Sequence, residues 1–401
     1  MIIGTFMSPI PRLRFHSGPA ILSYGFRPFF FLGAAFAGFG ILIWLPLLFG
    51  DIRIPTAFSP LDWHVHEMLY GYVPAVMTGF LLTAIPNWTG RLPLQGGPLA
   101  ALVALWIVGR VAVCVSQPVG ALAAGVIDCS FLFFVAAAAA REVIAGRNWR
   151  NLPPVAIVLV FFAGNVIFHV EDRLSGISSF GTRIGIAAAI ALISLIGGRV
   201  IPSFTHNWLA RENPGRLPAP FAQFDVAVLA VAVAALLLWI ALPNWPGTAV
   251  LLLIAGIGQA VRLTRWAGDR TLRDPLVLIL HVGYAFVPIG FVMVAGAIVL
   301  PGAIPLSAGL HAWTVGAIGT MTLAIMTRAS LGHTGRALAA GRLTQAIYLV
   351  VVAAAVLRIA AAFAPAATAL LHGAAAAWIA AFWIFAIGYG PALFQPRRSA
   401  R

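Results

Sequence analysis

Long apolar segments that follow one another along the chain are the feature that most limits its fold. From residue 25 to residue 392, charged side chains are concentrated in short stretches, and about twelve apolar segments lie between them. Each segment is long enough to cross a hydrocarbon core of about 30 Å as an α-helix, which takes roughly 20 residues. The sequence therefore predicts an all-α, polytopic membrane protein of about 12 transmembrane helices.

The composition agrees with a chain that has the lipid bilayer as a partner. Hydrophobic residues make up 61% of it and charged residues 9%, whereas soluble domains have about one charged residue in four. We expect one transmembrane domain over residues 25–392, a cytoplasmic N-terminal segment over 1–24 and a basic cytoplasmic tail over 393–401. The predicted helices cover residues 25–49, 66–88, 97–116, 119–141, 153–171, 181–203, 221–242, 245–266, 274–300, 304–328, 342–364 and 366–392.

The formal net charge of +14 raises the question of a nucleic-acid partner. Apart from histidine, all the basic residues are arginine, and most of them occupy the ends of the chain and every second connection between predicted helices, whereas the intervening connections carry almost none. Connections such as 243–247 and 301–305 carry none. By the positive-inside rule, this alternation predicts that both termini and the arginine-bearing connections are cytoplasmic. The charge therefore indicates topology, and no nucleic-acid partner is expected.

The stretch LDWHVHEMLYGY (61–72) places His64, His66 and Glu67 at the outer end of the second predicted helix. Residues two apart on a helix point about 200° away from each other, because each residue turns by about 100°. The two histidines are therefore expected to serve two different partners, whereas His64, Glu67 and Met68 share a face. Both imidazoles could instead bond only to loops and water, but a His-x-His-Glu cluster in a membrane helix favours metal binding.

Four further histidines complete the candidate set. His169 and His311 lie near the outer ends of their predicted helices, so that they join His64 and His66 in one outer layer. His281 and His333 lie toward the cytoplasmic side. Imidazole is a common ligand of haem iron and of copper. The candidate metal ligands are therefore His64, His66, His169, His311, His281 and His333.

Three arginines near the inner ends of predicted helices add a second polar layer. Arg27, Arg199 and Arg328 lie in the stretches GFRPFF, GGRVIP and IMTRAS. An arginine within a membrane can pair with an anionic group such as a haem propionate, and one near a helix end can instead extend to lipid headgroups. We expect these three to bind a cofactor together with the histidines of the outer layer.

Five blocks of this sequence resemble the signature blocks of the NnrS family: FRPFFFLGA (26–34), WHVHEMLYGY (63–72), GFLLTAIPNWTGR (79–91), GGRVIPSFTHNW (197–208) and HAWTVGAIGTMTLAIMTRASLGHTGR (311–336). The resemblance implies a haem- and copper-containing protein of the bacterial inner membrane, linked to nitric oxide metabolism and to protection against nitrosative stress. It implies haem b and copper as cofactors and nitric oxide as a partner. An electron donor would be a further partner if the protein is redox-active, and no sequence feature identifies one.

A weak internal repeat suggests a symmetry. Asn87-Trp88 and Arg91 recur as Asn207-Trp208 and Arg211 after a shift of 120 residues, and a second shift of 120 residues reaches Thr327-Arg328. Twelve helices would then form three pseudo-symmetric four-helix units, as in the catalytic subunits of haem-copper oxidases. In that arrangement His64 and His66 would be shared between two neighbouring centres.

Two other interpretations remain open at this point. Twelve helices interrupted by Gly and Pro also describe many secondary transporters of small solutes or metals. A transporter is expected to have coupling carboxylates, but Asp128 is the only one well inside a predicted span, and it can pair with Arg110 in the preceding helix. A non-catalytic gas sensor is the other interpretation, and the sequence does not distinguish it from an enzyme.

Overall fold

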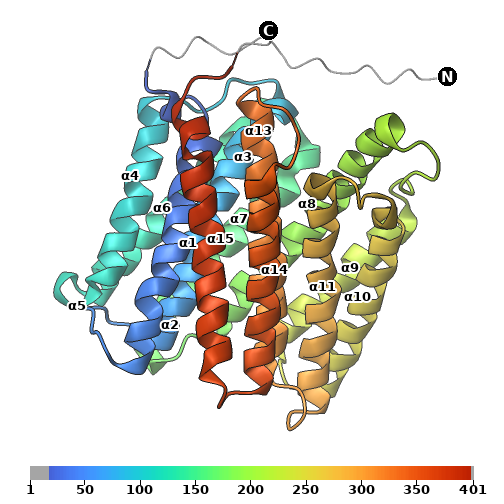
Figure 1. Ribbon diagram of the computed structural model, residues 1–401. Helices are drawn as coiled ribbons and strands as arrows, with labels where there is room; N and C mark the ends of the chain where they lie inside the picture. The colour runs from blue at the N-terminus through green and yellow to red at the C-terminus, as the bar shows by residue number, and fades with distance from the viewer. Residues whose placement is uncertain (1–17, 399–401) are drawn as a thin grey trace.

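The computed structural model describes residues 18–398, and within them the chain is helical without any β-strand (Figure 1). Twelve helical spans are long and apolar enough to cross a membrane, which confirms the predicted fold class. The spans are α1 (Phe26–Phe49), α2–η2–α3 (Pro60–Thr89), α4 (Gly97–Cys114), α6 (Ala121–Ala145), α7 (Leu152–Ser175), α8 (Ser179–Glu212), α9 (Gln223–Ala241), α10 (Pro246–Thr264), α11 (Pro275–Val299), α12–η5–α13 (Leu306–His333), α14 (Arg342–Phe363) and α15 (Thr368–Phe394). Shorter helical elements are η1 (Ala20–Leu22), α5 (Ser116–Val119), η3 (Trp149–Asn151) and η4 (Gly268–Arg270).

The second span begins earlier than the apolar pattern predicts, at Pro60 and not at residue 66. Ser59 caps it, because its hydroxyl accepts a hydrogen bond from the backbone N–H of Asp62 at 3.1 Å, and Pro60 suits the first helical position. His64 therefore lies inside the helix. The predicted end of the sixth span, at residue 203, is also too early, since α8 continues to Glu212.

The first and last spans close the bundle against each other. Figure 1 shows α1 and α15 side by side, with α14 next to α15. One guanidinium nitrogen of Arg27, at the start of α1, donates to the carbonyl oxygens of Leu393 and Gln395 at 2.7 Å each. We call this end of the molecule the terminal face and the other end the opposite face. Because twelve spans alternate in direction, most of the arginine-bearing connections lie at the terminal face, whereas Arg53, Arg173 and Arg183 lie near the opposite face.

Two spans contain a π-helical segment, and each segment directly follows a candidate histidine ligand. η2 (Glu67–Tyr72) follows His66, and η5 (Ala312–Gly319) follows His311. A π-helix closes its hydrogen bonds over one more residue than an α-helix, so it shifts the direction of the side chains around it, and such segments are frequent at functional sites. Both segments lie in the half of their span nearer the opposite face.

The spans that carry the three repeated sequence segments, α3, α8 and α13, all run from the opposite face to the terminal face. This common direction is what the repeat predicts. The threefold pseudo-symmetry itself stays a prediction.

Small residues let neighbouring spans approach at the level of their backbones. A Cβ atom at Gly181 of α8 would lie 2.7 Å from the backbone N and Cα atoms of Phe168 in α7. A Cβ atom at Gly309 of α12 would lie 2.8 Å from the backbone N of Val294 in α11. Helices in lipid associate largely through such close packing, since the surrounding acyl chains are as apolar as the helices themselves.

We therefore expect Gly181→Ala to destabilise the protein by about 1–3 kcal/mol, the cost of inserting an extra methyl group into a packed contact. The contacted atoms are backbone, so only a movement of α7 away from α8 can relieve the clash. Thermal unfolding in detergent measures the effect. Gly97→Ala is the control, since a Cβ atom there has no neighbour within 4 Å. Equal unfolding temperatures for the two variants would contradict the prediction.

Candidate metal centre and cofactor cavity

A buried polar cluster lies inside the first half of the bundle, near the opposite face. It joins residues of four spans: His66 and Glu67, Arg110 of α4, Asp128 of α6, and Asn165 and His169 of α7. The imidazole of His66 is at its centre. Its Nδ1 atom lies 3.0 Å from Oε1 of Glu67, and its Nε2 atom lies 3.0 Å from Oδ1 of Asn165 and 3.2 Å from Oδ2 of Asp128. Both ring nitrogens are thus in polar contact.

Arg110 links the two carboxylates of the cluster. Its Nη1 atom donates to Oε1 of Glu67 at 2.7 Å, and its Nη2 atom forms an ion pair with Oδ1 of Asp128. The expected pairing of Asp128 with Arg110 is confirmed. Asp128 also accepts a hydrogen bond from Asn165 Nδ2 at 2.7 Å and lies 3.1 Å from Nε2 of His169.

The charges of this cluster do not cancel when both imidazoles are neutral. His66, Glu67 and Asp128 are 0%, 1% and 2% exposed, and they contain two carboxylates against the single guanidinium of Arg110. An uncompensated charge is costly when it is buried. One further positive charge would balance the cluster, either a proton on an imidazole or a bound metal ion.

Three members of the cluster are arranged as a metal site would require. His66, Asp128 and His169 each offer one ligand atom, and these atoms lie within 4.8 Å of one another. Two imidazole nitrogens and one carboxylate oxygen suit a first-row transition metal, so the group can hold a metal ion. From the sequence, Asp128 is expected only as the ion-pair partner of Arg110. Carboxylates are rare in the middle of the spans, and this rarity was the signal that could have assigned Asp128 to the site.

A cavity of about 350 Å³ lies beside the cluster, and His64 and His311 both line it. We call it the His64–His311 cavity. Apart from these histidines and Arg358, most of its walls are apolar or aromatic. Its lining includes Ile41, Trp44, Leu61, Val65, Met68, Leu69, Tyr72, Val73, Ile186, Leu310, Val315, Ile318, Leu371 and Trp378. The cavity thus brings together histidines from two distant parts of the chain.

The two imidazoles in this cavity have little hydrogen bonding. The ring of His64 stacks on Trp44 with centroids 4.0 Å apart, and its buried Nδ1 atom has no hydrogen-bond partner. Nδ1 of His311 lies 2.6 Å from the carbonyl oxygen of Ser307, so this nitrogen is the donor and Nε2 keeps its lone pair. A backbone carbonyl that fixes the tautomer in this way is typical of histidines that bind a metal.

The predicted outer layer is thus divided between two places. His66 and His169 lie in the buried polar cluster, whereas His64 and His311 line the cavity. The two imidazoles of the His-x-His pair therefore face different surroundings, as their spacing predicts. Glu67, expected on the face of His64, directs its carboxylate to His66 in the cluster and does not line the cavity. Met68 does line the cavity with His64.

The histidines of the terminal side lie apart from both places. Nε2 of His281 is 2.8 Å from the hydroxyl oxygen of Thr205. His333 stacks on Tyr24, with ring centroids 5.8 Å apart, at the end of α13. The structure therefore does not bring these two histidines into one site with the other four.

The three candidate arginines are also separate from one another. Arg27 donates to backbone carbonyls at the end of α15, and the guanidinium of Arg328 lies 4.0 Å from the ring centre of Phe204. Arg199 lines a different cavity at the terminal face. No single anionic cofactor contacts all three in this arrangement.

Comparison with known protein families identifies the family of this chain. A family model described as NnrS protein matches residues 20–397, which is nearly the whole chain. The chain belongs to the NnrS family. The resemblance seen in five sequence blocks is thereby confirmed. No curated protein matches the chain.

The charge balance of the cluster predicts unequal effects of two substitutions in this NnrS-family protein. Arg110→Met leaves Glu67 and Asp128 facing each other without a cation, and we expect a loss of about 3–5 kcal/mol of stability. Asp128→Asn keeps the shape of the side chain and leaves Arg110 paired with Glu67 alone, so its cost is smaller. Thermal unfolding in detergent compares the two. An Asp128→Asn protein that is the less stable of the pair would contradict the charge argument.

Proposed function

We propose that this NnrS-family protein holds haem b and copper within the bacterial inner membrane, binds nitric oxide there and thereby protects the cell against nitrosative stress. The observation that carries the proposal is the His64–His311 cavity, in which imidazoles from two distant spans line one largely apolar space. Membership of the family supports the class of cofactor. The buried polar cluster beside the cavity supports a second metal.

The residues of the cavity fit haem. Imidazole nitrogen is the usual protein ligand of haem iron. Here Nδ1 of His64 is buried without a hydrogen-bond partner, and the contact of His311 Nδ1 with the Ser307 carbonyl leaves the lone pair on Nε2. A buried imidazole nitrogen without a partner costs about 1–3 kcal/mol, which binding to a metal would remove. Arg358 supplies a cation at the cavity wall, suited to a propionate group. We therefore assign His64 and His311 to the haem.

The buried polar cluster fits copper. Its two neutral imidazoles suit copper, and a donor set that includes the Asp128 carboxylate favours cupric over cuprous ion. The excess negative charge of the cluster would favour a bound cation. We assign His66, Asp128 and His169 to this metal, with Arg110 and Glu67 holding Asp128 and His66 in place.

The walls of the cavity suit a small apolar gas. Haem iron bound by one of the two imidazoles would supply a coordination position that nitric oxide can occupy. The chain contributes the surroundings: Trp44, Met68 and Trp378 exclude water, and the hydroxyl groups of Tyr72 and Thr322 are only 2.5 Å apart, so they satisfy each other. Binding of an uncharged gas needs no charged path from the surface.

The topology test uses reporter fusions. We propose that the terminal face is cytoplasmic, because the connections there carry the arginines and the opposite connections carry few. Fusions at 243–247 and 301–305 should report a periplasmic location, and a fusion after residue 398 a cytoplasmic one. A cytoplasmic report from the first two fusions and a periplasmic one from the third would refute the proposed orientation. The assignment of residues to the two metal sites would not change.

The cofactor test replaces each histidine by alanine. We expect His64→Ala and His311→Ala to lose the Soret band and bound iron but to keep copper, and His66→Ala and His169→Ala to lose copper. His372→Ala is the control, because His372 is exposed and bonds only to the carbonyl of Thr368 and packs on Phe49. Metal analysis and the visible spectrum of each purified protein give the result. Full haem and copper in all four variants would refute the assignments.

Nitric oxide binding is tested on the reduced, purified protein. Addition of the gas should shift the haem spectrum of the wild type. A haem spectrum that does not respond to the gas would refute the binding of nitric oxide. The metal assignments would not be affected, because they depend on the metal content of the histidine variants.

A further inference from the structure

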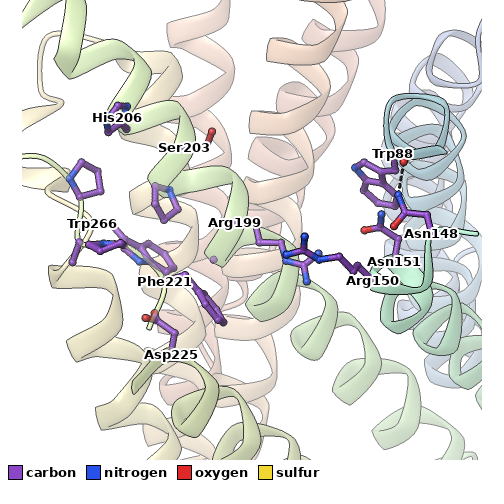
Figure 2. Close-up of a pocket in the computed structure, with 15 residues that line it drawn as sticks. Trp88, Asn148, Arg150, Asn151, Arg199, Ser203, His206, Phe221, Asp225 and Trp266 are labelled. Atoms are coloured by element: carbon purple, nitrogen blue, oxygen red, sulfur yellow. Dashed lines mark hydrogen bonds between the residues drawn. The ribbon is translucent and has the colours of Figure 1, made fainter. Parts of the chain in front are cut away.

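A larger cavity, of about 760 Å³, lies at the terminal face and is separate from both metal sites (Figure 2). It lies between the end of α3, the connection from α6 to α7, and the helices α8 and α9. We call it the terminal cleft. Its lining residues are Trp88, Asn148, Arg150, Asn151, Gly198, Arg199, Pro202, Ser203, His206, Pro218, Ala219, Pro220, Phe221, Asp225 and Trp266.

Two arginines converge in this cleft without a counterion. Figure 2 shows the side chains of Arg150, from η3, and Arg199, from α8, extending toward each other. Within residues 18–398, neither guanidinium has a carboxylate partner or a hydrogen bond. Two like charges directed at the same space repel each other unless an anion lies between them.

The carboxylate in the cleft does not supply this anion. Asp225 is the one acidic residue among the described lining residues, and it accepts from Nε of Arg262 at 3.0 Å. A guanidinium nitrogen of Arg265 lies 3.8 Å from its other oxygen. Asp225 is therefore already neutralised by the helix behind the cleft, and the charges of Arg150 and Arg199 remain.

The walls of the cleft indicate that the anion has an apolar part. Trp88, Phe221 and Trp266 line it together with three prolines. The cleft lies where the spans end, which is the depth of lipid headgroups, where tryptophan is also enriched. Its volume lies in the range of pockets for ligands much larger than a free phosphate ion, about 300–1,000 Å³.

A second, apolar cavity, of about 100 Å³, lies along the preceding turns of α8. Gly197 and Val200 line it from α8, next in sequence to Gly198 and Arg199 of the cleft. Its other walls come from α3 and from the span η5–α13, and Thr322 is the only polar residue among its lining residues in the described chain. An acyl chain that leaves the cleft along α8 would meet this apolar surface.

We propose that the terminal cleft binds an acidic membrane phospholipid. Its phosphate group lies between Arg150 and Arg199, and one acyl chain follows the apolar surface of α8 toward the middle of the bilayer. Guanidinium groups bind phosphate oxygens with paired hydrogen bonds, and two of them from different elements would fix the headgroup in one position. The lipid would then link the first five spans to α8 and α9 at this face. This proposal is independent of the haem and copper assignments.

The test measures lipid binding to the purified full chain by native mass spectrometry, with phosphatidylglycerol and phosphatidylcholine as probes. The wild type should retain phosphatidylglycerol in preference to phosphatidylcholine. The double variant Arg150→Gln/Arg199→Gln should bind phosphatidylglycerol at least about tenfold more weakly, because each arginine near an acidic lipid contributes about 1 kcal/mol. Both side chains are exposed, so the double variant is expected to fold.

The matched control is Arg273→Gln/Arg342→Gln. It removes the same charge from the same face, at two exposed residues outside the cleft. This variant should keep the affinity of the wild type, and phosphatidylglycerol should raise the unfolding temperature of the wild type and the control but not of the cleft variant. The visible spectrum of all three proteins should be the same.

Three results would overturn the proposal. Equal weakening in the cleft variant and the control would mean that the charge of the whole face attracts the lipid. A wild type without preference for phosphatidylglycerol would exclude an acidic headgroup in the cleft. Inorganic phosphate that displaces phosphatidylglycerol at equal concentration would show that the cleft recognises a free anion and that the apolar walls do not hold a chain.

Discussion

One guanidinium buried between two carboxylates is the interaction on which the first half of this membrane bundle depends. Arg110 reaches Glu67 on the π-helical segment and Asp128 on α6, and so fixes three spans relative to one another at one depth. An ion group of this kind is tolerated away from water only because nearly all its polar atoms are paired. The same contacts hold His66 in position, so the charge network that stabilises the packing also positions a group that can hold a metal ion.

The helix α8 lines the His64–His311 cavity, the apolar cavity and the terminal cleft. Thr182 and Ile186 line the His64–His311 cavity, Ala189, Ile193 and Val200 line the apolar cavity, and Arg199 lines the terminal cleft. Since residues three or four apart lie on one side of a helix, these cavities follow one broad side of α8 from the opposite face to the terminal face. The space in these cavities is therefore concentrated at the junction between the first spans and the rest of the molecule.

The positions of the candidate residues show how far the sequence could predict the site. The rule that residues two apart diverge on a helix separated His64 from His66 correctly, and the depth of each histidine in its span placed His169 and His311 near the same face. The sequence did not predict that the carboxylate of Glu67 contacts the neighbouring His66 in the cluster. The inner histidines and arginines were grouped by depth alone, which does not say on which side of the bundle a residue lies. The structure shows them bound to separate local partners such as Thr205 and Phe204.

The sequence by itself determined the fold class, the number of spans and their alternating direction, because the thickness of the hydrocarbon core and the need to satisfy backbone hydrogen bonds leave a long apolar segment only one conformation. It also determined the family, through blocks spread over most of the chain. Only the tertiary structure decided which histidines meet. The spans associate through close packing and a few buried polar contacts, and the rotation of each helix about its axis depends on all its neighbours at once. Asp128 joined the metal site, and Arg150 came to face Arg199, by that rotation.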